Sequence, residues 1–191
     1  MSNITHKWVN VLEPFSCGYK RSISASQISR ETKVPQQTVS RILNNLVKET
    51  IVKYENEGKN KKFSLENNSL RNIVLNIIES SKTLEFSLKQ RKISVILNEI
   101  LKFCESLIVF GSYSSGKSDK KSDLDIVVIS ARDKTRINSL VEDYSVEVHI
   151  QFVSYSELNA LIKKETPLMK EIIQNHIIYG DVSKVVEVLN E

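Results

Sequence analysis

Two aspartates one residue apart have the clearest potential for chemistry in this chain. Asp123 and Asp125 begin the run Asp-Leu-Asp-Ile-Val-Val-Ile, whose apolar part predicts a β-strand. Side chains two residues apart on a strand share a face, so both carboxylates are expected to project together. Adjacent negative charges beside an apolar run are unfavourable unless a cation neutralises them, and carboxylate oxygens suit Mg²⁺. The pair therefore predicts a divalent-metal site, with two ions in one cluster.

A third candidate carboxylate lies in the run Val-Glu-Val-His-Ile-Gln-Phe-Val at 146–153. Its alternation predicts a strand that has Glu147, His149 and Gln151 on its polar face. If this strand neighbours the strand of the two aspartates, Glu147 completes a three-acid cluster and is a candidate general base. His149 is interpreted as an ordinary strand residue.

A glycine-serine pair follows the short apolar run Leu-Ile-Val-Phe at 107–110, which predicts another strand. Gly111 allows a phosphate to approach the backbone closely, and Ser112 offers a hydroxyl or an amide to it. Lys117, in the polar loop that follows, is a candidate partner for triphosphate charge.

The same loop also satisfies a phosphate-binding P-loop motif. Residues 111–118, Gly-Ser-Tyr-Ser-Ser-Gly-Lys-Ser, fit G-x-x-x-x-G-K-[ST]. A P-loop must open into a substantial helix, however, and no helical apolar period follows Ser118. Only 73 residues remain after it, few for the parallel sheet of that fold. The match is therefore interpreted as a coincidence.

The Gly-Ser pair, the polar loop and the phrase Ser-Asp-Leu-Asp at 122–125 resemble the polymerase-β-like minimal nucleotidyltransferases, from about Leu107 to the C-terminus. The resemblance implies a small mixed-sheet domain that moves a nucleoside monophosphate, preferably AMP from ATP, to a hydroxyl and releases pyrophosphate. It assigns nucleotide binding to Gly111, Ser112, Lys117 and Ser122, and catalysis with two Mg²⁺ ions to Asp123, Asp125 and Glu147. Ser115 stands where many relatives have a basic residue.

The first third of the chain has a different pattern. Helices are expected over 5–15, over 24–31 and from residue 36 onward, and two alternating runs around Gly58 predict a β-hairpin over 51–65. Pro35 suits the first turn of the third helix. This order of elements resembles the winged helix-turn-helix regulators, and the third helix is similar to their recognition helix.

Charge and side-chain chemistry favour DNA as the ligand of this region. Residues 1–70 contain 11 Lys and Arg against 6 Asp and Glu, a net charge of +5, whereas the remainder has 16 against 17. Excess positive charge attracts phosphate backbones, and amide and guanidinium groups read base edges. The candidate contacts are Gln36, Gln37, Ser40, Arg41 and Asn44 on the third helix, and Lys59, Lys61 and Lys62 at the hairpin tip.

The expected fold class is α+β, in two domains joined by helices. A winged helix-turn-helix domain is predicted over 1–68, a helical linker over 69–104 and the nucleotidyltransferase domain over 105–191. No apolar run approaches the length of a membrane span, and two distant cysteines fit a reduced compartment, so a cytoplasmic protein with no membrane partner is expected.

Partners are implied by the resemblance alone. Relatives of this size include antitoxins that adenylylate a helical toxin of the HEPN type, which would make the N-terminal domain an autoregulatory DNA reader. The linker helices are compatible with a homodimer. The alternative hypothesis is a transcriptional regulator whose C-terminal domain only senses nucleotide.

Overall fold

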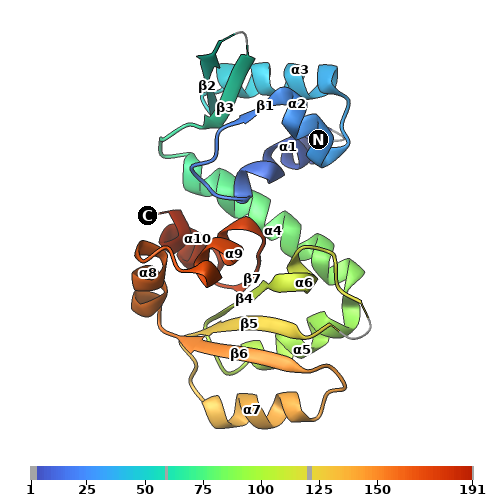
Figure 1. Cartoon of the computed structure of the whole chain (residues 1–191), viewed down its shortest axis with the longest axis vertical. Helices are drawn as coiled ribbons and strands as arrows, with labels where there is room; N and C mark the ends of the chain where they lie inside the picture. Colours follow the sequence, from blue (N-terminus) through green and yellow to red (C-terminus); the bar gives the residue numbers. More distant parts are fainter. Residues whose placement is uncertain (1–3, 59, 120–121, 191) are drawn as a thin grey trace. The chain divides into compact units, whose positions relative to one another are not determined.

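The protein, described here by a computed structural model, divides into two compact units, Met1–Ile78 and Glu79–Glu191. The structure describes residues 4–58, 60–119 and 122–190. The division lies within helix α4 (Arg71–Lys89), which begins the region where a helical linker was expected (Figure 1).

In its described residues, the first unit contains three α-helices, a 3₁₀ helix, the beginning of α4 and a small antiparallel sheet. Its elements are α1 (Ile4–Leu12), the 3₁₀ helix η1 (Glu13–Ser16), β1 (Ile23–Ser24), α2 (Ala25–Thr32), α3 (Gln36–Lys48), β2 (Val52–Glu57) and β3 (Asn60–Leu65). The sheet order is β1-β3-β2. The predicted helices and hairpin are therefore confirmed, except that the first helix becomes a 3₁₀ turn around Pro14.

Local sequence signals explain where these helices begin and end. Ser24 caps α2 in a capping box with Gln27, and Lys33 ends the helix in the left-handed conformation. Pro35 precedes α3, whose buried side includes Val39 and Leu43. These residues determine where α2 ends and where α3 begins. With Val39 and Leu43 buried, the polar side of α3 is left exposed.

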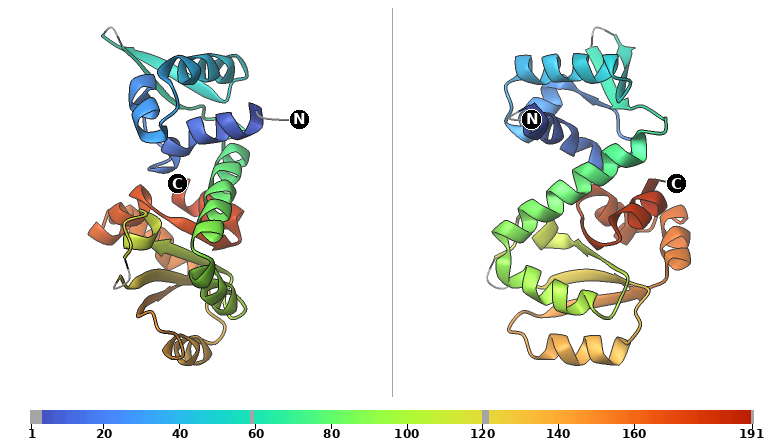
Figure 2. Two further views of the ribbon diagram at one scale, coloured as in Figure 1. Left: turned by 90° about the vertical axis from the view of Figure 1, so that its right-hand side faces the viewer. Right: turned by 180° about the vertical axis from the view of Figure 1, so that it is seen from behind.

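The second unit is built on a four-stranded mixed sheet (Figure 2). Its remaining elements are α5 (Arg91–Leu101), β4 (Ser106–Phe110), α6 (Gly111–Ser114), β5 (Leu124–Ile129), α7 (Lys134–Glu142), β6 (Val148–Val153), α8 (Tyr155–Lys163), α9 (Pro167–Gln174), β7 (Ile177–Gly180) and α10 (Val182–Asn190). The strand order is β6-β5-β4-β7, where only β5 and β6 are parallel. The α+β class and the small mixed sheet are thus confirmed.

Strand alternation sends apolar side chains to both faces of this sheet. Leu107 and Val109 belong to a core cluster with buried residues of α5 and α7, whereas Ile108 and Val127 occupy the alternate positions. Helices α8, α9 and α10 contact β6, β4 and β7 respectively. Both faces of the central strands are therefore covered by helices.

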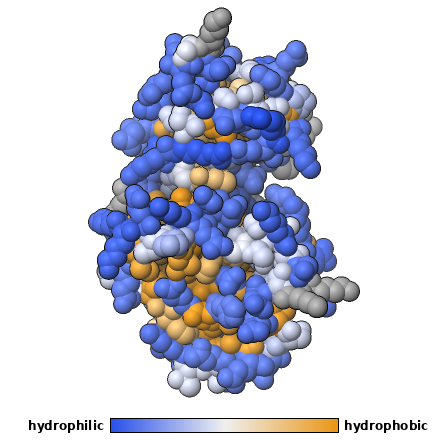
Figure 3. Space-filling model, in the orientation of Figure 1, coloured by the Kyte–Doolittle hydropathy of each residue, from blue (hydrophilic) through white to orange (hydrophobic). Residues whose placement is uncertain are grey.

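The surface of the two units differs in character. Figure 3 shows mainly hydrophilic side chains on the visible face of the first unit, and apolar side chains gathered over β5 and β6 in the second. Strand β6 forms an edge of the sheet, and its Val148, Ile150 and Phe152 are only partly buried. In the part of the chain that the structure describes, no helix has the length and apolarity that a membrane crossing requires.

A buried charge cluster anchors α4 within the second unit. The Glu79 carboxylate is fully buried, lying 3.2 Å from His176 Nε2 and 2.8 Å from Lys82 Nζ. His176 Nδ1 lies 2.7 Å from the Ile172 carbonyl oxygen and therefore carries a proton, because a carbonyl only accepts. Burial alone would raise the pKa of Glu79, but the charges and hydrogen bonds of His176 and Lys82 outweigh it and lower that pKa to about 2.

We predict that Glu79→Gln destabilises the second unit by about 3–5 kcal/mol near pH 7, because it leaves buried positive charge without its partner. Denaturant unfolding monitored by circular dichroism measures this loss. The matched control is Glu85→Gln, which removes an exposed ion pair with Lys89 on the same helix and should cost about 0.5 kcal/mol.

The lowered pKa of Glu79 also predicts how the stability of the protein changes in acid. Because folding lowers the pKa of Glu79 from its ordinary 4.5, its contribution is present above about pH 4.5 and is lost as the pH falls towards 2. The wild type should therefore lose more stability between these pH values than Glu79→Gln does. Parallel acid profiles for the two proteins would contradict this assignment.

Candidate functional site

The glycine-serine corner lies directly over one of the two predicted aspartates. Strands β4 and β5 are antiparallel and pair Phe110 with Asp125, so that Gly111 leaves β4 beside the Asp125 carboxylate. Gly111 has a positive φ of 71°, and a Cβ placed on it would lie 2.5 Å from Asp125 Oδ2. Both the backbone conformation and the space therefore require glycine at this corner.

The chain after the corner is a short turn held by its own hydrogen bonds. Helix α6 spans only four residues, and the Lys117 amide donates to the Ser112 carbonyl oxygen at 3.0 Å. The Ser122 hydroxyl accepts from the Asp119 amide at 2.8 Å. Ser112 thus remains at the corner. Ser122 orders the loop that precedes β5, and Lys117 is exposed on the loop after α6.

This geometry does not support a P-loop. No helix follows Lys117 in the described part of the segment between α6 and β5, and β5 begins at Leu124. The expectation that the P-loop motif is coincidental agrees with this short connection. Lys120 and Lys121, which belong to the same loop, lie outside the described residues.

A histidine connects the predicted acids across the sheet. The parallel pairing of β5 with β6 puts His149 opposite Asp125, and His149 Nδ1 lies 3.3 Å from Asp125 Oδ1. The other ring nitrogen, Nε2, lies 3.4 Å from Glu147 Oε1. Glu147 itself precedes β6, and its side chain is 72% exposed. Asp123 precedes β5 in the same way and is partly buried.

The negative charge of this cluster acts on the histidine. The pKa of His149 is raised mainly by its hydrogen bond with Asp125. The hydrogen bond with Glu147 and the charges of Asp123 and Asp125 act in the same direction. All three acids that were predicted to form a cluster therefore act to raise the pKa of His149.

The acids have suitable chemistry for a cation, but they are not gathered into a preformed cage. Among residues 4–58, 60–119 and 122–190, no group of three or more His, Cys, Asp or Glu side chains is arranged to hold a metal ion. Carboxylate oxygens are nevertheless suitable ligands for a divalent cation that carries a nucleotide phosphate. Gly111 has no side chain to cover the Asp125 carboxylate, which leaves room for such a cation. The three-acid cluster itself stays a prediction.

His149 is the residue that sequence reasoning undervalued. Its position two residues after Glu147 on the predicted polar face was the available signal. The sequence could not show that β6 pairs with β5 in parallel, in the register that brings His149 to Asp125. That register changes an ordinary strand residue into part of the candidate site.

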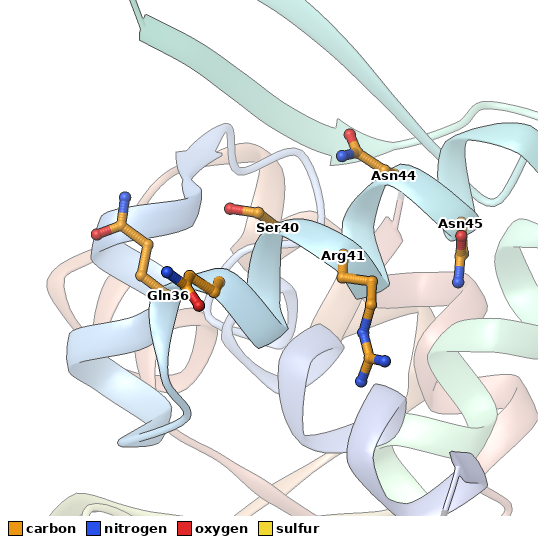
Figure 4. A pocket seen from close by; sticks show the side chains of 6 residues that line it. Gln36, Ser40, Arg41, Asn44 and Asn45 are labelled. Carbon is orange, nitrogen blue, oxygen red and sulfur yellow. The ribbon is translucent and has the colours of Figure 1, made fainter.

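In the first unit, the exposed side of α3 forms a polar surface. Figure 4 shows Gln36, Ser40, Arg41, Asn44 and Asn45 projecting from the helix, and these residues with Gln37 line a hollow. The sequence of α3 contains no Asp or Glu. All five predicted helix contacts therefore lie together, and Asn45 joins them.

The two described lysines of the hairpin tip both have contacts within the first unit. Lys62 Nζ lies 3.6 Å from Glu57 Oε2 and 3.4 Å from Gln27 Oε1, and the Lys61 ammonium lies 4.0 Å from the centre of the Tyr54 ring. Lys59 lies outside the described residues. Of the lysines described at this tip, Lys62 is thus already paired with an acid.

We predict that Gly111→Ala costs about 1–3 kcal/mol more stability than Gly116→Ala. Both glycines have positive φ, so both variants incur the backbone strain of about 1–2 kcal/mol, but a Cβ at Gly116 meets nothing within 4 Å. Urea unfolding of the two variants measures the difference, which reflects the displaced Asp125 carboxylate. Equal losses would contradict the close contact.

Comparison with known proteins finds a family match in the part of the chain that contains this candidate site. Residues 90–179 match the family model described as nucleotidyltransferase domain. The match covers 90 of the 191 residues, begins just before α5 and includes both Gly111 and Asp125. Comparisons with curated proteins and with solved structures returned no significant match. The second unit therefore contains a segment similar to the nucleotidyltransferase domain family, which supports a transferase activity.

Proposed function

We propose that the second unit transfers a nucleoside monophosphate, AMP from ATP in the preferred case, to a hydroxyl acceptor. The acceptor oxygen forms a bond to the α-phosphorus, the bond between that phosphorus and the α–β bridging oxygen breaks, and pyrophosphate leaves. The hydroxyl proton passes to a base, for which Glu147 is the candidate. Gly111 and Ser112 are the proposed contacts of the triphosphate.

The carboxylates of Asp123, Asp125 and Glu147 are the proposed holders of the divalent ions, with Mg²⁺ expected for an all-oxygen site. When bound, such ions neutralise phosphate charge and stabilise the departing pyrophosphate. The protein's own contribution in this proposal is to hold Asp125 beside the Gly111 corner and to leave its carboxylate accessible. Its side chain is 29% exposed.

The observation that carries this proposal is the contact between Gly111 and Asp125 inside the segment that matches the nucleotidyltransferase family. A glycine that must be glycine for reasons of space, directly over a carboxylate, is expected where a phosphate and its cation approach the backbone. If this position served only the packing of the core, an apolar side chain would be expected in place of the Asp125 carboxylate.

The first unit is proposed to be a winged helix-turn-helix domain that binds DNA. The supporting observation is the polar side of α3, which presents amides, a hydroxyl and a guanidinium without any carboxylate. These groups pair with base edges and phosphates. Because Lys62 is paired with Glu57, α3 is proposed to contribute more to binding than the hairpin.

The acceptor is proposed to be a hydroxyl of a partner protein, a helical toxin of the HEPN type being the candidate that the family resemblance offers. A homodimer and a cytoplasmic location belong to the same proposal. The alternative, a regulator that senses nucleotide without transferring it, is favoured by one observation, the lack of a preformed three-group metal site in the described residues.

We predict that the full chain transfers label from ATP labelled in its α-phosphate to an acceptor in cell extract. Asp125→Asn and Asp123→Asn should each lower the rate at least about 100-fold, because each removes a negative charge that the cations need. Glu142→Gln, which changes an exposed acid at the end of α7, is the matched control.

The label experiment also separates the two hypotheses. Binding of ATP without any transfer would support the sensor. Transfer that persists in Asp125→Asn would contradict the proposed site.

For the first unit, we predict that Arg41→Ala weakens binding to a random DNA duplex several-fold and lowers the salt slope of log K by about one. Fluorescence anisotropy over a series of salt concentrations measures both quantities. Lys92→Ala removes one exposed positive charge from the second unit and is the control. If both variants weaken binding equally, α3 is not the DNA surface.

A further inference from the structure

The polar side of α3 consists mainly of primary amides. Four of the six residues that line its hollow are glutamine or asparagine. The labelled side chains in Figure 4 project away from the helix. The lining residues are Gln36, Gln37, Ser40, Arg41, Asn44 and Asn45. Amides rather than charged groups therefore give this surface its chemistry.

These amides are available to a ligand, because all four side chains are exposed. Elsewhere in the first unit, amide groups are used within the fold. Gln27 Oε1 accepts from the Ser24 amide at 3.1 Å, and Asn68 Nδ2 donates to the Thr50 carbonyl oxygen at 2.7 Å. The α3 amides instead present their donors and acceptors to solvent.

The spacing of these residues matches the length of several base pairs. Gln36, Ser40 and Asn44 are four positions apart, so they lie on adjacent turns along one side of the helix. At about 1.5 Å per residue, Gln36 and Asn45 are about 13.5 Å apart along the helix axis. That length corresponds to about four base pairs at about 3.4 Å each, so one side of α3 is long enough to follow them.

An amide side chain suits adenine better than the other bases. Its donor and acceptor lie side by side and pair with N7 and N6 of adenine in the major groove. Guanine presents two acceptors there and pairs with arginine or lysine, whereas cytosine presents a donor and pairs with a carboxylate. Among the described residues that line the hollow, Arg41 alone is cationic, and the sequence of α3 contains no carboxylate. The chemistry of this side thus favours A·T pairs.

We propose that α3 reads an A·T-rich run of about four base pairs in the major groove through its amides, with Arg41 on a neighbouring phosphate. This inference rests on the DNA binding proposed for the first unit and deepens it by naming the base pairs that are recognised. A bidentate pair of an amide with adenine discriminates against the wrong base by about fivefold or more. The net positive charge of residues 1–70 supplies the attraction that does not depend on sequence.

The test compares binding of the full chain to three duplexes of equal length at one salt concentration. They contain A·T, inosine·cytosine or G·C pairs in the same alternating order, and fluorescence anisotropy measures each dissociation constant. An inosine·cytosine pair has the major-groove groups of G·C and the minor-groove groups of A·T. The A·T duplex should therefore bind at least about tenfold more tightly than both of the others.

The other results overturn the inference. Equal binding to A·T and inosine·cytosine would assign recognition to the minor groove or to DNA shape, and equal binding to all three would show that the bases are not read. In both cases the DNA binding proposed for the first unit stands. A lack of measurable binding to any of the duplexes overturns the inference and the proposed DNA binding together.

Single substitutions test the amides themselves. Gln37→Ala and Asn44→Ala should each lower the ratio of A·T to G·C affinity at least about fivefold, because each removes one bidentate partner of adenine. Alanine favours helix and both positions are exposed, so circular dichroism should show an unchanged fold. Asn67→Ala, which removes an exposed amide after β3, is the matched control and should leave the ratio unaltered. An unaltered ratio in both α3 variants overturns the proposal.

Discussion

The candidate site depends on strand register in the sheet of the second unit. Antiparallel pairing of β4 with β5 and parallel pairing of β5 with β6 bring Phe110, Asp125 and His149 into one row across three strands. Gly111 follows directly after that row. A slip of one residue in either pairing would turn Asp125 or His149 towards the apolar core, so the buried pattern that fixes the register also fixes the site.

This constraint is maintained by the core on the opposite side of the strands. Leu124 and Ile126, which flank Asp125, are fully buried, and they hold the carboxylate on the other face at the end of the sheet. Moving these apolar side chains into water would oppose any rearrangement of β5. The site therefore combines a rigid strand with a short turn, α6, which is a suitable arrangement for positioning a flexible phosphate chain.

Much of this arrangement could be predicted from the residues, because its signals are local. Short apolar runs predicted β4 and β5, alternation predicted β6, and Gly58 marked the hairpin. The role of His149 could not be predicted, since it depends on which strands are neighbours and in which register. The same holds for Glu79, whose burial beside His176 arises from contacts nearly a hundred residues apart in sequence.

The surfaces were also harder to predict than the elements. Lysines at the hairpin tip indicated a basic hairpin, but Lys62 lies diagonally across the strands from Glu57 and forms an ion pair with it, and a sequence pattern does not contain that contact. The polar side of α3 was easier to predict, because helical periodicity alone separates the buried Val39 and Leu43 from the exposed amide side chains. Side-chain chemistry on one element is thus predictable where contacts between elements are not.

The central claim is that nucleotide binds at the corner of Gly111 and Asp125. The most direct measurement is an NMR titration of the isotopically labelled full chain with a non-hydrolysable ATP analogue and Mg²⁺, following backbone amides. The account predicts that the largest shifts occur at Gly111, Ser112 and Asp125 and that they vanish in Asp125→Asn. Largest shifts on α3, or shifts that survive this substitution, would contradict it.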